Sequence, residues 1–199
     1  ATQVSQEDHL MSASVSRPLV SGTAFKDPII RFVGTAALLY LGWYVFYEFY
    51  LHPAGWLDAA LIDSLIQLSG SGLSLLGYDL IPEPINTENI RTIGVQGGHL
   101  LWIGDACNGA GLFAVFLIFL VAYPGPWKHK LWYGAFGLVI IHLMNVLRII
   151  ALSIIVTINY ELLNFNHDYT FYVVVYGCVF ILWYVWVKRF APLNELKAR

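Results

Sequence analysis

The sequence contains few charged residues. Only 12% of its 199 residues are charged, whereas 58% are hydrophobic, and the formal net charge is −2. A soluble domain usually carries about twice that share of charge. The absence of a basic excess also argues against a nucleic-acid-binding surface. The composition therefore predicts a protein with several membrane-spanning segments.

Cysteine is scarce as well, because the chain contains only Cys107 and Cys178. On an expected helix Cys178 lies beyond His167 and is roughly 16 Å deeper in the membrane at about 1.5 Å per residue. A disulfide needs Cα atoms within about 7 Å, so both cysteines are expected to be free thiols. The sequence also lacks C-x-x-C, H-E-x-x-H and G-x-S-x-G patterns. Metal and serine-hydrolase sites therefore lack support, and no cofactor or metal is expected.

Four apolar segments approach or meet the length of a membrane-spanning helix, about 20 residues. They are residues 29–51, 107–123, 131–158 and 169–187. Residues 56–76 are apolar but interrupted by polar residues, which favours an amphipathic helix along the outer face. Residues 90–103 alternate loosely around two glycines and predict a short hairpin. The predicted fold class is an all-α polytopic membrane protein with four transmembrane helices, an outer-face amphipathic helix and this hairpin-like segment.

Basic residues near the span ends set the predicted orientation. With four spans they all fall on one side, which should be cytoplasmic: Arg17, Lys26, Arg31, Lys128, Lys130, Lys188, Arg189, Lys197 and Arg199. Both termini are then cytoplasmic, and the protein is expected in the cytoplasmic (inner) membrane. We expect a polar N-terminal segment at 1–28, one membrane-embedded domain at 29–190 and a cytoplasmic tail at 191–199. Residues 1–10 precede Met11 and are interpreted as a remnant outside the fold.

Three ionisable residues are predicted to reach the outer boundary together. Cys107 opens the second span from the outer face, and His167 stands just before the last span. Arg148 lies well inside a helix that starts on the inner side, roughly 25 Å up a core about 30 Å thick. A thiol, a fixed cation and a titratable base at one membrane face are typical of nucleophilic catalysis.

The thiol and the arginine each have a structural alternative. A cysteine in a membrane helix is usually a small hydrophobe, which suits Cys178. Cys107 differs because a helix N-terminus favours its thiolate. An arginine inside a span costs about 2.5–3.5 kcal/mol on insertion scales. Arg148 could still snorkel or bond carbonyls, and Asn145 on the same helix face could orient its guanidinium or simply pack.

The histidines are less specific than the thiol. His99 also falls on the outer side and precedes Cys107 by eight residues, so it is the alternative base. His167 is favoured because a helix mouth holds a ring more rigidly than the glycine-rich segment beside His99. His142 lies nearer mid-span and could be a satisfied core residue or a haem ligand, but no facing histidine is found for haem.

Three short motifs carry a resemblance to a known family. They are Asp105-Ala106-Cys107-Asn108-Gly109, Asn145-Val146-Leu147-Arg148 and Asn166-His167-Asp168. In order, spacing and expected depth they resemble the exosortase/archaeosortase family of integral membrane cysteine enzymes, over about residues 56–187. The family usually shows Ser where this chain has Asn108, so a hydroxyl role at that position is absent here.

The resemblance implies an exosortase-like cysteine transpeptidase or protease. Its substrates would be membrane-anchored proteins with a C-terminal sorting signal, made of a short motif, a transmembrane helix and a basic tail. The acceptor, a lipid or a glycan, is unknown; membrane lipids are expected partners and nucleic acid is not. Cys107 would be the nucleophile, His167 the base and Arg148 the oxyanion donor, supported by Asn108, Asn145 and Asp168.

Two other functions remain compatible with the sequence. A non-enzymatic membrane scaffold or assembly subunit could use the same polar residues to lock helices together by hydrogen bonds. A small-molecule transporter would more typically need broken helices and polar sites at the midplane. The break at Gly70, Ser71 and Gly72 is the only hint of a transporter.

Overall fold

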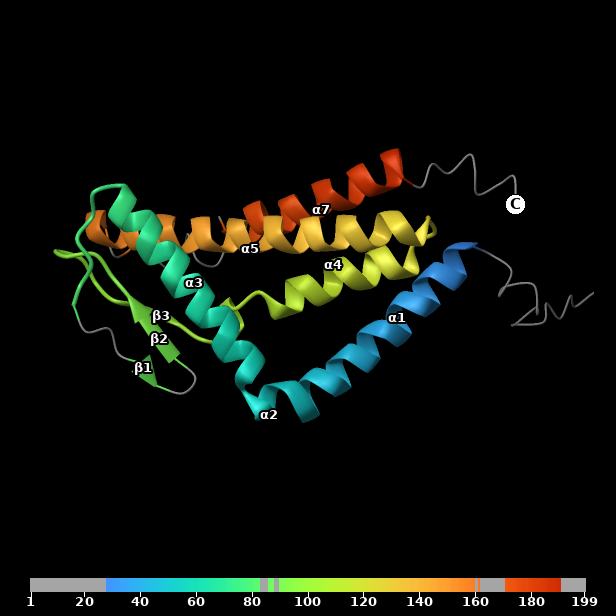
Figure 1. The fold of residues 1–199 in the computed structure, drawn as a ribbon, viewed down its shortest axis with the longest axis horizontal. Helices are drawn as coiled ribbons and strands as arrows, with labels where there is room; N and C mark the ends of the chain where they lie inside the picture. The colour runs from blue at the N-terminus through green and yellow to red at the C-terminus, as the bar shows by residue number, and fades with distance from the viewer. Residues whose placement is uncertain (1–27, 83–85, 88–89, 160, 162–170, 191–199) are drawn as a thin grey trace, which may run out of the picture.

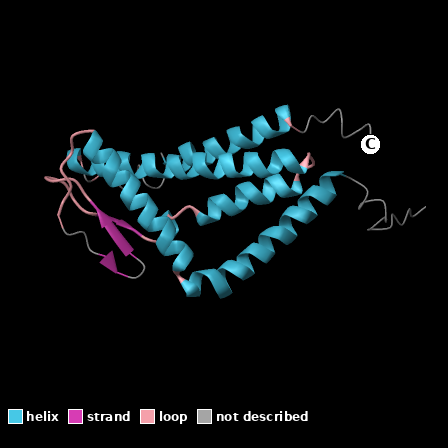
Figure 2. Cartoon of the chain, viewed as in Figure 1, coloured by secondary structure: helices cyan, strands magenta, loops and turns pink. Residues whose placement is uncertain are grey.

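The computed structural model describes residues 28–82, 86–87, 90–159, 161 and 171–190, and the fold is mostly helical (Figure 1). The long helices are α1 (Pro28–Phe46), α3 (Trp56–Leu75), α4 (Ala110–Ala122), α5 (Trp127–Ile158) and α7 (Phe171–Arg189). Figure 2 shows the strands confined to one end of the molecule. They are β1 (Asn86–Thr87), β2 (Ile90–Ile93) and β3 (Leu101–Ile103).

The first predicted span is one continuous helix. A π-helical turn, η2 (Tyr47–Leu51), and a short helix, α2 (His52–Ala54), extend α1 without interruption. Gly55 then adopts a left-handed conformation with φ of 68°, which glycine tolerates because it has no Cβ. The chain turns there and enters α3, so the prediction of a helix over 29–51 is confirmed.

Helices α4, α5 and α7 pack together into a bundle with its own core (Figure 1). Phe116, Ile141 and Trp186 from the three helices are fully buried in this core. Gly137 of α5 leaves room for the Phe116 ring, which a Cβ would overlap. Helix α1 joins the bundle at one end, where the Phe32 ring packs edge-on against Phe119, 5.6 Å between centroids.

A second core joins α3, the sheet and the C-terminal half of α5. The contacts between α3 and α5 follow the same order along both helices. Ser64 Oγ lies 3.0 Å from His142 Nε2, and Ser69 Oγ donates to the Val146 carbonyl at 3.4 Å. Helices α3 and α5 therefore run in the same general direction and cross obliquely (Figure 1). The prediction of a helix over 56–76 lying along the outer face did not include this packing. The depth of α3 relative to a bilayer stays a prediction.

The hairpin predicted over 90–103 is confirmed as two antiparallel strands. Arg91 of β2 pairs with Ile103 of β3, and Gly97 turns between them with φ of 85°. The sequence did not predict β1, which adds a third strand antiparallel to β2. An all-α description is therefore corrected to a mostly helical fold with a small three-stranded sheet.

The second predicted span begins later than expected. Residues Asp105–Cys107 form a 3₁₀ turn, η3, and α4 starts only at Ala110 because Gly109 takes a left-handed φ of 84°. Cys107 therefore lies in the turn that precedes α4 and does not open the helix. Within the described residues, two helices are long and apolar enough to cross a membrane, Pro28–Ala54 and Trp127–Ile158. Helix α4 is apolar but shorter.

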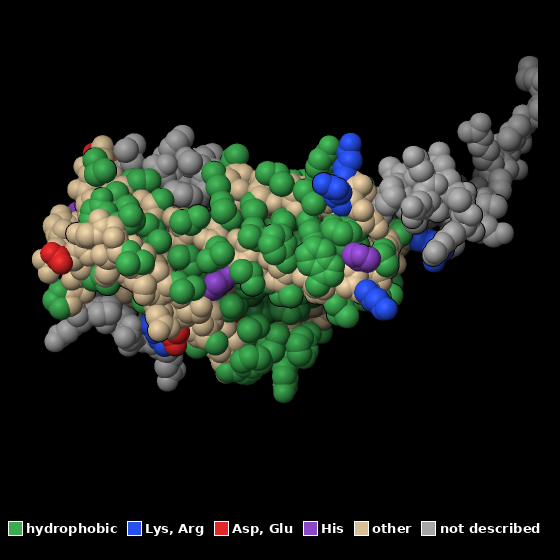
Figure 3. All heavy atoms as spheres, turned by 45° about the horizontal axis from the view of Figure 1, so that its top comes forward, with side chains coloured by type: hydrophobic (Ala, Val, Ile, Leu, Met, Phe, Trp, Pro, Cys, Tyr) green, Lys and Arg blue, Asp and Glu red, His purple; other side chains and the backbone are tan. Residues whose placement is uncertain are grey.

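Most basic residues of the described chain gather at one end of the bundle. The start of α5 meets the end of α7 there, where the rings of Tyr133 and Phe190 lie 5.4 Å apart. The start of α1 meets the end of α4 through Phe32 and Tyr123. These contacts bring together five cations: Arg31, Lys128, Lys130, Lys188 and Arg189. Figure 3 shows Lys and Arg at this end and hydrophobic side chains over the middle of the molecule, the charge pattern that the predicted orientation requires.

Candidate active site

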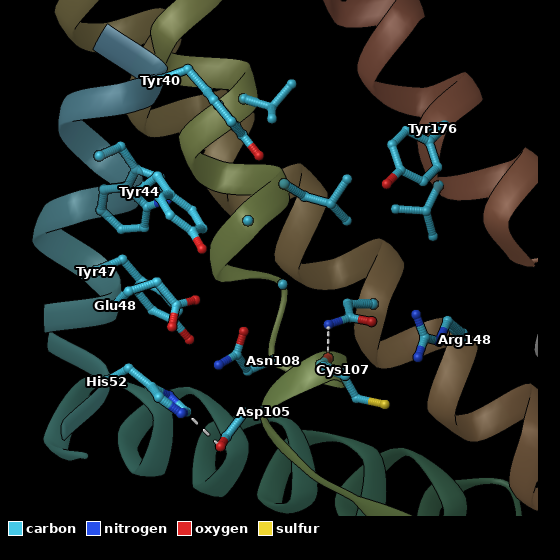
Figure 4. A pocket seen from close by; sticks show the side chains of 18 residues that line it. Tyr40, Tyr44, Tyr47, Glu48, His52, Asp105, Cys107, Asn108, Arg148 and Tyr176 are labelled. Atoms are coloured by element: carbon cyan, nitrogen blue, oxygen red, sulfur yellow. Dashed lines mark hydrogen bonds and ion pairs between the residues drawn. The ribbon is translucent and has the colours of Figure 1, made fainter. Parts of the chain in front are cut away.

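A cavity of about 520 Å³ lies where α1, α4, α5 and α7 converge (Figure 4). Four of the six predicted site residues line it: Cys107, Asn108, Asn145 and Arg148. Segments far apart in the sequence form its walls, with Tyr44 from α1 and Tyr176 from α7 among the lining side chains. His167 and Asp168, the other two predicted residues, lie outside the described residues.

The turn that carries Cys107 is fixed by asparagine side chains on both sides. Asn145 donates through Nδ2 to the Cys107 carbonyl at 2.7 Å. Asn108 accepts the Ala110 N–H at 2.8 Å through Oδ1, which satisfies one of the free amides at the start of α4. Gly109 passes close to Asn145, and a Cβ there would lie 3.2 Å from Nδ2. The thiol is half-buried and is held by a turn whose backbone has little freedom.

Arg148 brings an uncommitted donor to the cavity. Its Nε is buried and, in the part of the chain that the structure describes, finds no hydrogen-bond partner. Asn145 Oδ1 is likewise buried and without a hydrogen-bond partner among the described residues. A buried polar group without a partner costs about 1–3 kcal/mol, and three further unpartnered groups, on Ser153, Trp183 and Trp186, belong to residues that do not line the cavity. In Figure 4 the Cys107 sulfur points toward the α5 side, where Arg148 lies, and away from His52.

Asp58 of α3 is the centre of a buried hydrogen-bond network under the Cys107 turn. The residue is only 3% exposed. It accepts hydrogen bonds from Tyr47 Oη at 2.7 Å and from Asn108 Nδ2 at 2.6 Å, and its Oδ2 lies 3.0 Å from His52 Nδ1. One carboxylate thus joins α1, α3 and the Cys107 turn.

The acidic residues near Asp58 differ from it in environment. Asp63 lies five residues further along α3. It is exposed and pairs with Arg91 Nε at 2.8 Å. Glu48 is also exposed. Asp105 is partly buried beside Asp58, and burial, reinforced by the Asp58 charge, raises the pKa of its carboxyl while His52 lowers it. The cavity therefore has an acidic side at η3 and a cationic side at α5.

His52, Asp58 and Asp105 present ligand atoms within 4.8 Å of one another, a spacing that could hold a metal ion. Both Asp58 oxygens, however, already have partners, Oδ1 in Tyr47 and Asn108 and Oδ2 in His52. These contacts account for the geometry without an ion. His142, considered above as a haem ligand, lies next to Ser64 Oγ at 3.0 Å and matches the reading of a satisfied core residue.

Replacement of Asp58 by Ala is expected to destabilise the fold far more than Asp63→Ala. The first change leaves Asn108 Nδ2 and Tyr47 Oη without their acceptor in a buried site, at about 1–3 kcal/mol for each group. The second removes an exposed ion pair worth about 0–1 kcal/mol. Thermal unfolding in detergent measures both variants. Equal melting temperatures would contradict a structural role for the Asp58 network.

Comparisons with known proteins identify relatives of this chain. The model of the transmembrane exosortase family matches residues 19–185, most of the chain. The chain is also 30% identical over 127 residues to a probable archaeosortase D of Methanocaldococcus jannaschii, an alignment that covers 62% of this chain and 78% of that protein. No solved structure matches.

The apolar helices and the family match together define a membrane protein. The chain belongs to the exosortase/archaeosortase family. Homologues in this family are cysteine-type proteases or transpeptidases. The family match covers Cys107, Asn145 and Arg148, all of which line the cavity.

Proposed function

We propose that this protein is a membrane cysteine transpeptidase or protease that cleaves the C-terminal sorting signal of exported, membrane-anchored proteins. The observation that supports this most strongly is the cavity, in which a thiol on a fixed turn faces the side that carries the unpartnered Nε of Arg148. A scaffold explains the satisfied Asp58 network, but it gives no role to a thiol that lines a cavity together with an arginine.

In the proposed reaction Cys107 is the nucleophile. His167 takes the proton of the Cys107 thiol. The thiolate attacks the scissile carbonyl carbon, a C–S bond forms and the carbonyl oxygen becomes an oxyanion that Arg148 stabilises with its fixed donors. The C–N bond then breaks, and His167 returns the thiol proton to the leaving amine. Asn145 and Asn108 position the turn, and Asp168 supports the imidazolium of His167. An amine or hydroxyl acceptor, or water, then resolves the thioester.

The proposed topology has four membrane spans, built on α1, α4, α5 and α7, in the cytoplasmic membrane. The cluster of cations at one end of the bundle supports an inner position for that end and for both termini. Cys107 lies near the opposite end of α4, so the active site would face outward. A reporter fused after Lys130 should behave as cytoplasmic, and an external signal from that fusion would overturn the orientation.

The base is tested by paired substitution of two histidines. His167→Ala should eliminate acyl-enzyme formation, because the thiol then has no positioned proton acceptor. His99→Ala should reduce it only mildly. Single-turnover assays with a co-expressed protein ending in a sorting signal give both rates. The reverse pattern would assign the base to the β2–β3 hairpin and leave His167 as an interfacial residue.

A further inference from the structure

We propose that the groove between α1 and α7 binds the transmembrane helix of the substrate, with the start of that helix at Cys107. This inference rests on the proposed function and adds the path that the substrate takes through the membrane part of the enzyme. The groove is the membrane-side part of the cavity described above, and six residues define it: Tyr40, Tyr44, Gly111, Leu112, Val115 and Tyr176.

The walls of the groove are aromatic and come from helices on opposite sides of α4. Helix α1 packs against α4, and α7 packs against both α4 and α5. Tyr40 and Tyr44 form the α1 wall and lie about one helical turn, or roughly 6 Å, apart along the helix. Tyr176 forms the α7 wall. Figure 4 shows Tyr40 and Tyr44 on one side of the cavity and Tyr176 on the other.

The floor of the groove is the first part of α4, and it allows a helix to approach closely. Gly111 is exposed, and a Cβ built there meets nothing within 4 Å. Small residues at membrane interfaces let helix backbones come near each other, which favours association by close packing. Leu112 and Val115 continue the same face with aliphatic side chains.

Among the described residues, helix α1 also lacks a complete packing surface. None of its residues is buried, although it is largely apolar after Arg31. Lipid or a second copy could cover such a helix. The substrate helix is favoured because the groove is continuous with the Cys107 cavity. In the proposed substrate the transmembrane helix follows closely after the scissile bond, so attack by Cys107 on that bond requires the helix beside the start of α4 until the C–N bond breaks and the helix leaves with the amine.

A tethered peptide tests this placement in the full chain. The Cys178→Ala variant, whose single thiol is Cys107, is placed in lipid nanodiscs. It is treated with a synthetic peptide that carries an N-terminal cysteine as its pyridyl disulfide, a Leu/Ala helix of about 20 residues and a Lys-Arg tail. Disulfide exchange joins the peptide to Cys107 and releases the pyridine thiol. Tethering replaces sequence-specific recognition with a high effective concentration.

Photo-crosslinking residues then report where the tethered helix lies. They replace Tyr44 and Tyr176 in the groove, and as matched controls Val45 and Ile181, which are exposed on other faces of the same two helices. Crosslinks to the peptide should be several-fold stronger at Tyr44 and Tyr176 than at Val45 and Ile181. The same peptide without its cysteine measures the background.

The outcomes separate the two proposals. If the peptide attaches to Cys107 but crosslinks evenly at the four positions, or mainly at Val45 and Ile181, the groove proposal is overturned and the proposed function stands. Crosslinks from Tyr44 to a second copy of the chain would overturn it in the same way. The Trp127→Cys variant, which carries a thiol at an exposed position, is the control for attachment. If the peptide attaches to this variant at the new thiol but does not attach to Cys107, Cys107 is not an available nucleophile and both proposals fail.

Discussion

Cys107→Ala is expected to abolish processing of a substrate protein, with a loss on the order of 10⁴-fold or more, as for other enzymes deprived of their covalent nucleophile. No other thiol can replace it, because Cys178, the second cysteine of the chain, packs with the bundle core of α4, α5 and α7. The fold should persist, since the Cys107 carbonyl, which accepts from Asn145, is retained. Immunoblotting of the co-expressed substrate measures the loss.

Cys178→Ala is the matched control for this substitution. It removes the other thiol from a helix that does not carry the Cys107 turn, so processing should continue near the normal rate.

Membrane insertion and melting temperature should be unchanged in the Cys107→Ala variant. Normal processing by a folded Cys107→Ala protein would contradict the mechanism.

Arg148→Lys is expected to reduce processing about 10²–10³-fold, the usual effect of removing one donor to an oxyanion. Lysine keeps the positive charge but lacks the planar guanidinium, including the Nε that is buried beside the cavity without a partner. The effect should appear in kcat rather than in KM, since an oxyanion forms only during the reaction. Steady-state kinetics in detergent or nanodiscs separate the two constants.

Arg91→Lys provides the matched control for this prediction. Arg91 Nε donates to the exposed Asp63 carboxylate at 2.8 Å, and neither residue lines the cavity. The conservative change there should leave kcat almost unchanged. If Arg148→Lys behaved like Arg91→Lys, Arg148 would supply only general electrostatic support and the oxyanion would need another donor.

The helices and the hairpin were predictable because their signals are local. Continuous apolar runs predicted α1, α4, α5 and α7, and the alternation around Gly97 predicted the pairing of β2 with β3. The predicted start of α4 was less accurate. Cys107 lies in a 3₁₀ segment, and a left-handed turn at Gly109 separates that segment from α4. Apolar periodicity alone does not report such a turn.

The buried network and the cavity wall depend on contacts between distant parts of the chain. Asp58 and Asn108 are separated by 50 residues, and the sequence offered no pattern that links them. An aspartate in an apolar helix was itself a usable signal, because a buried carboxylate requires partners. The tyrosines of α1 that line the cavity were also missed. Their spacing places them on one face of the helix, but the same spacing can occur on any lipid-exposed membrane helix and does not identify a cavity.

The most direct test of a thiol-based mechanism is detection of the acyl-enzyme itself. A substrate protein is mixed with the purified enzyme, the reaction is quenched in acid, and the digest is analysed by mass spectrometry. The account predicts a hydroxylamine-sensitive thioester on the peptide that contains Cys107, carrying the new C-terminus of the substrate and absent from Cys107→Ala. Cleaved substrate without that adduct, or the same adduct on another residue, would contradict it.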